Sequence, residues 1–172
     1  MNAPRFEDLA PGHERRPYDQ TPARAERWAS RKARGELAVV ESPYLGGPPW
    51  ALLYARLALR EQLDLGRIPF ASHLLYPQAL NDAKPEQRKL GIEAGWIPYA
   101  MGAIAAVYVD FGITLGMQEG IEEAKRLGCK LEARAFGTAH REVVLRAAGG
   151  APYPYGPELA AQSTVIEWPG GL

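Results

Sequence analysis

AIAAVYVDFGITLGMQEGIEEAKRLG, residues 103–128, combines a buried strand, a polar turn and an amphipathic helix in one stretch. Residues 103–109 form a continuous apolar run, which is typical of a strand covered on both faces of a parallel sheet. The following residues are polar and contain glycine, after which Met117, Ile121 and Ala124 recur at helical spacing. Ligands bind beyond the carboxyl ends of strands in an open α/β sheet. We therefore expect a site at this turn.

Strand and helix patterns alternate along the chain around this stretch. Short apolar runs at 37–40 and 68–71, and an alternating run at 130–136, predict three further strands. Helical patterns at 50–65 and 84–101 lie between them. Strands that alternate with helices in this way predict a right-handed α/β sandwich with a parallel sheet.

The two ends of the chain do not follow this pattern. We predict a polar N-terminal arm at 1–35, an α/β domain at 36–136, and a C-terminal extension at 137–172 that packs on the domain or on a neighbouring subunit. The extension contains a strand-like segment at 164–168. Clustered arginines in the arm would suit a polyanion, but interspersed acidic residues favour a solvated arm that packs on another subunit.

Composition limits the class of protein and its partners. The 172 residues are 47% hydrophobic and 23% charged, which suits one globular domain with a substantial core. Twenty basic residues balance twenty acidic ones, so no global positive field favours a nucleic-acid partner. Because Cys129 is the single cysteine, an internal disulfide is excluded and a cysteine-rich metal site is disfavoured. We expect neither a metal nor a cofactor.

Hydropathy bears on the cellular compartment. The N-terminus lacks the apolar core of a signal peptide, and no apolar run approaches the length of a membrane span. A single cysteine also fits a reducing environment. We therefore expect a soluble, cytoplasmic protein without a membrane partner.

The loop after the first strand, ESPYLGGPPW at 41–50, has the geometry of an anion or sugar-phosphate site. Two prolines suit the start of a helix, and the glycines before them let the backbone approach a ligand. The loop matches neither a Walker motif nor the GxGxxG fingerprint. A plain turn between strand and helix is the commoner meaning of such a loop, and it remains open.

Two side chains near this cleft have both a binding and a structural interpretation. Arg56 lies on the second turn of the helix and would hold a carboxylate or phosphate, although a surface arginine is commoner. His73 follows the second strand and would face the same cleft as Tyr44 and Asp110, or would be a hydrogen-bonded structural residue. No second histidine stands at metal-ligand spacing.

Three ordered motifs resemble the nucleoside 2-deoxyribosyltransferase-like superfamily. They are SPYLGG at 42–47, PFASHLLYPQALND at 69–82 and DFGITLGMQEGIEEAKRLG at 110–128. The similarity is greatest to a branch of uncharacterised bacterial and phage proteins with SPY, PHLLYPQ and GxSxGMxxEI patterns. It covers residues 37–136 and leaves both ends unmatched.

This resemblance implies a Rossmann-like or flavodoxin-like three-layer sandwich with a parallel sheet of about five strands. It also implies a protein that cleaves or exchanges the N-glycosidic bond of a nucleoside or nucleotide. The residues that it places at the ligand are Ser42, Tyr44, Gly46 and Gly47 on the base or phosphate side, His73, Asn81 and Asp82 from the second loop, and Asp110, Thr114, Gly116 and Met117 at the sugar.

The sequence departs from the family pattern at the expected nucleophile. The family's glutamate, which attacks the anomeric carbon, aligns with Gly120, while Glu119 stands one place earlier. One residue is about 100° of rotation on a helix, so Glu119 replaces the nucleophile only if the first turn is irregular. A glycine inside a helix costs about 1 kcal/mol against alanine, so Gly120 marks a close approach of a ligand or another chain.

Two hypotheses follow from this departure. In the first, the protein is an enzyme with Glu119 or Asp110 as the carboxylate and with His73 or Tyr44 orienting the leaving group. In the second, it binds a nucleotide or sugar phosphate without chemistry, as a sensor, a sequestering protein or an assembly component. The unmatched ends and a Pro/Gly/Tyr stretch at 149–157 also lead us to expect a homo-oligomer.

Overall fold

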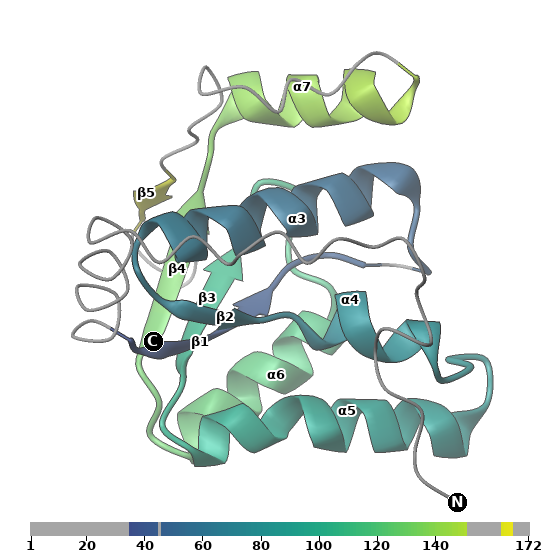
Figure 1. The fold of residues 1–172 in the computed structure, drawn as a ribbon, viewed down its shortest axis with the longest axis vertical. Helices are drawn as coiled ribbons and strands as arrows, with labels where there is room; N and C mark the ends of the chain where they lie inside the picture. The colour runs from purple at the N-terminus through teal and green to yellow at the C-terminus, as the bar shows by residue number, and fades with distance from the viewer. Residues whose placement is uncertain (1–34, 45, 151–162, 167–172) are drawn as a thin grey trace, which may run out of the picture. The chain divides into compact units, whose positions relative to one another are not determined.

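A five-stranded sheet forms the centre of the computed structural model, which describes residues 35–44, 46–150 and 163–166. The strands run in the order β2-β1-β3-β4-β5 (Figure 1). Their bounds are Leu37–Glu41 for β1, Ile68–Phe70 for β2, Ile104–Tyr108 for β3, Leu131–Ala135 for β4 and Thr164–Val165 for β5. Strands β1 to β4 are parallel to one another, which confirms the predicted parallel sheet.

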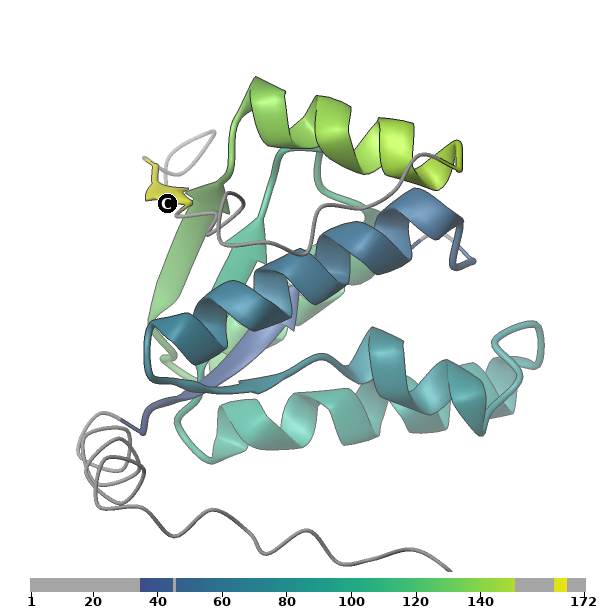
Figure 2. The same ribbon diagram turned by 45° about the horizontal axis from the view of Figure 1, so that its top comes forward.

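Helices cover both faces of this sheet and make three layers. The helices are α3 (Pro49–Asp64), α4 (Ser72–Leu75), η1 (Tyr76–Gln78), α5 (Pro85–Ala100), α6 (Leu115–Arg126) and α7 (Thr138–Ala148). Helices α3 and α7 lie on one face, and α5 and α6 lie on the other (Figures 1 and 2). The predicted α/β three-layer sandwich of the Rossmann and flavodoxin type is thus confirmed.

Burial on both faces explains why β3 reads as an uninterrupted apolar run. All five of its residues are buried, and alternate side chains enter different cores. Ala106 and Tyr108 pack with Tyr54 of α3, whereas Ala105 and Val107 face α5 and α6. The small alanine side chains let helices approach the sheet closely on each side.

The order of the strands places a crevice at a defined point. After β2 has paired with one edge of β1, the chain crosses over to place β3 on the other edge. This reversal is the topological switch point of a flavodoxin-like sheet, and ligands bind outside the carboxyl ends of the strands there. We therefore expect a ligand site at the loops that follow β1 and β3.

The fifth strand lies within the segment that the sequence marked as strand-like. β5 spans Thr164–Val165 and pairs antiparallel with β4, whereas the sequence predicted a strand-like segment at 164–168 without a direction. Thr164 pairs with Ala135, so the chain re-enters the sheet at the end where β4 finishes. An antiparallel strand needs no crossover to do so. Residues 167–168 lie outside the described residues.

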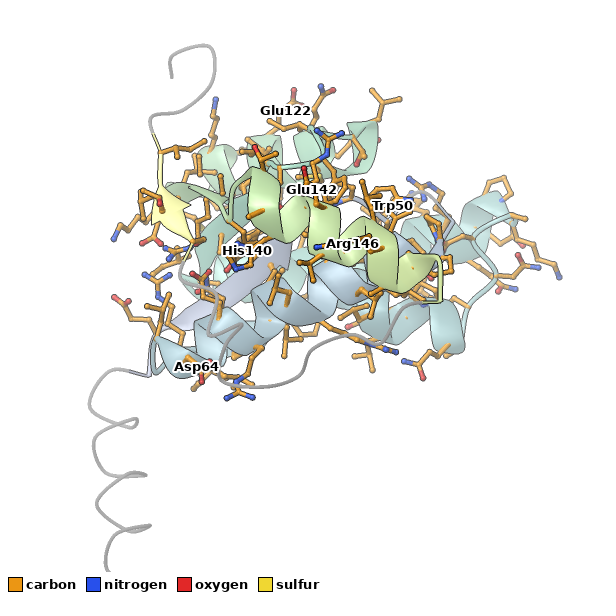
Figure 3. The ribbon with its side chains drawn as sticks, turned by 90° about the horizontal axis from the view of Figure 1, so that it is seen from above. Trp50, Asp64, Glu122, His140, Glu142 and Arg146 are labelled. Atoms are coloured by element: carbon orange, nitrogen blue, oxygen red, sulfur yellow. The ribbon has the colours of Figure 1, made fainter. Side chains whose placement is uncertain are left out.

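Helix α7 was not predicted from the sequence. It packs on α3, and Val144 is its one buried residue. Figure 3 looks onto this helix, with His140, Glu142 and Arg146 along it. The compact unit that contains the sheet runs from Arg34 to Leu172 and includes α7 and β5. The predicted arm up to residue 34 and most of the Pro/Gly/Tyr stretch lie outside the described residues.

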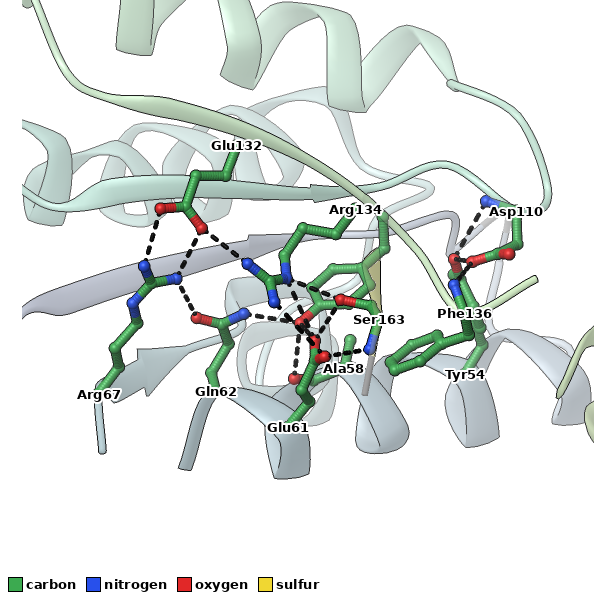
Figure 4. Close-up of polar contacts among 11 residues, drawn as sticks. Tyr54, Ala58, Glu61, Gln62, Arg67, Asp110, Glu132, Arg134, Phe136 and Ser163 are labelled. Atoms are coloured by element: carbon green, nitrogen blue, oxygen red, sulfur yellow. Dashed lines mark hydrogen bonds and ion pairs between the residues drawn. The ribbon is translucent and has the colours of Figure 1, made fainter. Parts of the chain in front are cut away.

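A buried network of charged side chains joins α3 to β4 and β5 (Figure 4). Arg134 donates to Glu61 at 3.2 Å and to Glu132 at 2.8 Å. Arg67 makes a two-bond contact with Glu132 at 2.8 Å, which holds the pKa of that carboxyl down at about 2. Glu61 also accepts the hydroxyl of Ser163 at 2.8 Å and its backbone N–H. The network thus fastens the C-terminal strand to the domain.

Candidate functional site

A pocket of about 400 Å³ opens beyond the carboxyl ends of β1, β2 and β3. Its walls come from the segment after β1, from α4 and η1 after β2, from the start of α5, and from the start of α6 after β3. This is the switch point identified above, on the α5 and α6 side of the sheet. The volume is in the range of small-molecule sites.

Many of the residues predicted to contact a ligand meet at this pocket. Those that line it are Ser42, Tyr44, Gly46, His73, Asp82, Thr114, Gly116 and Met117. They come from three segments that are far apart in the sequence. The lining also includes residues that we did not predict, namely Glu41, Ser72, Tyr76, Pro77, Arg88, Gly91, Ile92 and Leu115.

The other predicted residues lie outside the described lining. Glu119 is exposed on α6, and Arg56 is exposed on α3, which covers the opposite face of the sheet. The Asn81 side chain accepts the backbone N–H of Ala83 at 3.0 Å and closes a local turn. Gly47 has a positive φ of 75° and donates its N–H to the carbonyl of Tyr44, so it shapes the loop.

Asp110 has a structural environment on the far side of the sheet from the pocket. Its carboxylate accepts the hydroxyl of Tyr54 at 2.5 Å and the N–H of Phe136 at 3.0 Å (Figure 4). It also accepts the N–H of Gly137 at 2.7 Å. Burial and the nearby Asp110 carboxylate raise the pKa of Tyr54, so this hydroxyl remains a donor. Asp110 therefore ties the end of β3 to the end of β4 and to α3.

Glu41 supplies a carboxylate to the pocket. It is the last residue of β1, and it accepts the hydroxyl of Tyr99 from α5 at 2.7 Å. Burial raises the pKa of Glu41 to about 7, and the hydrogen bond from Tyr99 opposes that rise. Both protonation states are therefore populated at neutral pH. An acidic residue that ends an apolar strand at the carboxyl edge of a sheet is the sequence signal that we overlooked.

Gly120 of α6 lies directly beside this carboxylate. A Cβ atom built on Gly120 would stand 2.8 Å from Cδ of Glu41, closer than real Cβ contacts, and 3.2 Å from its Oε2, which is also tight. The carboxylate of Glu41 thus fills the space that a side chain at position 120 would occupy. The sequence predicted a close approach at Gly120 by a ligand or another chain. The group that approaches is instead a side chain from β1 of the same chain.

Ser42 and His73 form a neutral polar pair in the same pocket. The hydroxyl oxygen of Ser42 is 2.9 Å from Nε2 of His73. Burial lowers the pKa of His73 to about 4, so the imidazole is uncharged at neutral pH. The ring of Tyr44 lies 5.9 Å from the ring of His73. This wall offers hydrogen bonds and an aromatic face to a ligand.

The start of α6 forms a further wall. Thr114 is the N-cap residue, and its hydroxyl accepts the N–H of Met117 at 3.4 Å. The N–H groups of Leu115 and Gly116 belong to the first helical turn, which has no carbonyl one turn earlier to bond. These backbone donors lie at the pocket because Leu115 and Gly116 line it.

Two further properties concern the described part of the chain only. Its His, Cys, Asp and Glu side chains form no group of three or more that would hold a metal ion. None of its helices has both the length and the apolar character that crossing a membrane requires.

The chain matches a known protein family. The family model described as a domain of unknown function, DUF7768, matches residues 36–134, which is more than half of the chain. No curated protein and no solved structure matches the chain. The matched residues contain the four parallel strands, apart from the last residue of β4, and the whole lining of the pocket.

Proposed function

The chain belongs to the DUF7768 family, whose description assigns no function. From the pocket, we propose that this protein binds a nucleoside, nucleotide or related N-glycoside and cleaves or exchanges its N-glycosidic bond. Glu41 is the reacting carboxylate in this proposal. The motifs that resemble nucleoside 2-deoxyribosyltransferases support the class of ligand. The pocket supports it through the residues of those motifs that it brings together.

The observation that carries the proposal is the partly buried carboxylate of Glu41 against Gly120. Cleavage of an N-glycosidic bond passes through a transition state with positive charge on the sugar, which a carboxylate stabilises or attacks. The resemblance expects that carboxylate on α6 at position 120, and Glu41 reaches the same space from β1. The chemistry therefore retains its charged group although position 120 carries no side chain.

Neighbouring groups suit the leaving base. His73 is neutral and hydrogen-bonded to Ser42, so it offers a hydrogen bond without a charge. Tyr44 adds an aromatic face on which a planar base would pack. The departing base would take its proton from solvent, because the Glu41 carboxyl must be ionised to act on the sugar. These groups orient the base while the carboxylate acts on the sugar.

A second candidate function is binding without turnover. The observation that favours it is that position 120 lacks the side chain of the nucleophile that the resemblance expects, while burial raises the pKa of Glu41 to about 7 and so favours its uncharged form. The same pocket would then hold a nucleotide or sugar phosphate for sensing, sequestration or assembly.

The experiment uses the full chain and a panel of nucleosides and nucleoside 5′-monophosphates, with release of free base measured by chromatography. We expect release by the wild type and a loss of at least about 100-fold in Glu41→Gln, the scale of removing a reacting group. Glu122→Gln is the matched control because Glu122 is an exposed carboxylate on α6 outside the pocket (Figure 3).

Glu119→Gln separates the two candidate carboxylates. If it abolishes release while Glu41→Gln does not, the assignment to Glu41 is wrong. Tight binding of a panel member by the wild type without release of base would support the second candidate. No binding and no release for any member would overturn both.

A further inference from the structure

Arg88 is the one permanently charged cation in the described lining of the pocket. It lies on the first turn of α5, and its guanidinium makes no hydrogen bond or ion pair with any described residue. Its neighbour Lys89, by contrast, is paired with Glu93 at 3.6 Å on the outside of the same helix. Asp82 also lines the pocket but does not pair with Arg88. The guanidinium is therefore available to a ligand.

The position of Arg88 relative to α6 suits an anion. A Cβ atom built on Gly116 would have Nη2 of Arg88 as its nearest neighbour, at 3.9 Å. Arg88 thus lies over the first turn of α6, where the backbone N–H groups of Leu115 and Gly116 also face the pocket. A guanidinium fork and backbone donors at one point match the oxygen atoms of a phosphate.

Two glycines of α6 relate this point to the reacting carboxylate. Gly116 and Gly120 are four residues apart and lie on one face of the helix, about 6 Å apart along its axis. Arg88 stands over Gly116, and the Glu41 carboxylate stands against Gly120. A ligand lying along this face would meet a cation at one end and a carboxylate at the other. In a nucleoside 5′-phosphate, the ribose ring and one methylene group separate the anomeric carbon from the phosphate. This separation is comparable to the distance between Gly116 and Gly120 along the helix.

We infer that Arg88 anchors a phosphate monoester and that the substrate class is nucleoside 5′-monophosphates rather than free nucleosides. This inference rests on the proposed function for the identity of the ligand. The phosphate would lie between Arg88 and the start of α6, and the sugar would lie between Gly116 and the Glu41 carboxylate, with its anomeric carbon at Glu41.

The test compares each nucleoside with its own 5′-monophosphate. Dissociation constants are measured by calorimetry, and release of base is measured by chromatography, for the wild type, Arg88→Gln, Arg88→Lys and the control Lys89→Gln. We expect the wild type to prefer the monophosphate by at least about tenfold, which corresponds to about 1.4 kcal/mol. Arg88→Gln should lose the preference while keeping the affinity for the nucleoside. Arg88→Lys should keep part of the preference for the monophosphate, and Lys89→Gln should keep all of it.

Failure of this inference and failure of the proposed function give different results. Equal handling of nucleoside and monophosphate by the wild type, or an unchanged preference in Arg88→Gln, overturns the role of Arg88 and leaves cleavage intact. Binding of monophosphate that depends on Arg88, without release of base, supports the anion site and rejects the enzyme. Inorganic phosphate competes with the monophosphate but not with the nucleoside if the anion site is correct.

Discussion

The carboxylate of Glu41 and the backbone of Gly120 are in direct contact, although the two residues come from a strand and a helix in different layers. The helix has no room for a side chain at position 120 while Glu41 holds its place. Glu41 is held in turn by the hydroxyl of Tyr99 at 2.7 Å. The two positions therefore share one volume, and a substitution at either is expected to depend on the other.

Gly120→Ala should destabilise the protein in the presence of Glu41 and stabilise it in its absence. Alanine favours a helix by about 1 kcal/mol over glycine, but here its Cβ would collide with the carboxylate, and overpacking typically costs about 1–3 kcal/mol. In a Glu41→Ala background the collision disappears. Urea unfolding of the two single variants and the double variant measures this coupling. Gly116→Ala is the control, because the nearest atom to its Cβ is 3.9 Å away. Equal effects of Gly120→Ala in both backgrounds would contradict the shared volume.

Stability should depend on pH through Glu41 in a direction set by its raised pKa. Between pH 4.5 and about 7, the folded protein keeps a proton on Glu41 that the unfolded chain has released. The stability from this group is therefore complete below pH 4.5 and is lost as the pH rises to about 7, by about 3 kcal/mol in all. His73 acts in the opposite direction, because its pKa is 6.5 in the unfolded chain and about 4 in the folded protein. Its contribution to the stability of the protein is therefore lost as the pH drops from 6.5 to about 4.

Glu41→Gln should expose this opposition. Between about pH 4.5 and 6.5, Glu41 lowers the free energy of unfolding of the wild type as the pH rises and His73 raises it, so the two effects cancel. The variant keeps only the effect of His73, so its free energy of unfolding increases as the pH rises. The measurement is the difference in the free energy of unfolding between the variant and the wild type from pH 4 to 8, in which all other groups cancel. A difference that does not change with pH would show that Glu41 titrates normally.

Asp110→Ala should reduce stability and leave ligand binding at the pocket unchanged. The substitution leaves the hydroxyl of Tyr54 and two backbone N–H groups without their acceptor, at a cost of about 2–4 kcal/mol in the free energy of unfolding. Asp64→Ala is the control, because Asp64 is paired with Arg60 on the surface and should contribute less than about 1 kcal/mol. If Asp110→Ala were fully stable but inactive, Asp110 would belong to the chemistry, as one of the sequence hypotheses held.

Arg134→Met should be among the most destabilising substitutions in the domain. It leaves Glu61 buried without its cation, and breaking a buried ion pair in this way costs about 3–5 kcal/mol. Glu132 retains Arg67 and Lys130, so the loss centres on Glu61. Arg126→Met removes the exposed pair with Glu123 and should change the free energy of unfolding by less than about 1 kcal/mol. Chemical denaturation of both variants measures the contrast. Equal midpoints would show that the network contributes little.

The class of fold was predictable because its signals are local. Unbroken apolar runs such as that of β3 arise where a strand is covered on both faces, and prolines 49 and 85 begin α3 and α5 as the sequence indicated. Several pocket residues were predictable for a related reason. Residues that follow parallel strands meet at one edge of the sheet, which brings Tyr44, His73 and Thr114 to the same pocket.

Other features were not predictable because their signals are weak or lie far apart in the sequence. Helix α7 has neither a capping side chain nor a proline at its start, whereas α3 and α5 begin at prolines, so the sequence carries no local signal for where α7 begins. Arg134 and Glu61 are separated by 73 positions and look like surface residues until α3 packs on β4. Asp110 stands at the end of β3, where a ligand was expected, but its side chain turns to Tyr54 on the other face.

By itself, the sequence determined that this chain forms a layered α/β domain with a crevice at its strand ends, because hydrophobic spacing and turn residues act over a few positions. Only the tertiary structure decided which carboxylate occupies that crevice. Once β1 lies beside β3, the Glu41 side chain reaches the α6 backbone at Gly120. The contact depends on the spacing between a strand and a helix in adjacent layers, a distance that no local pattern of residues encodes.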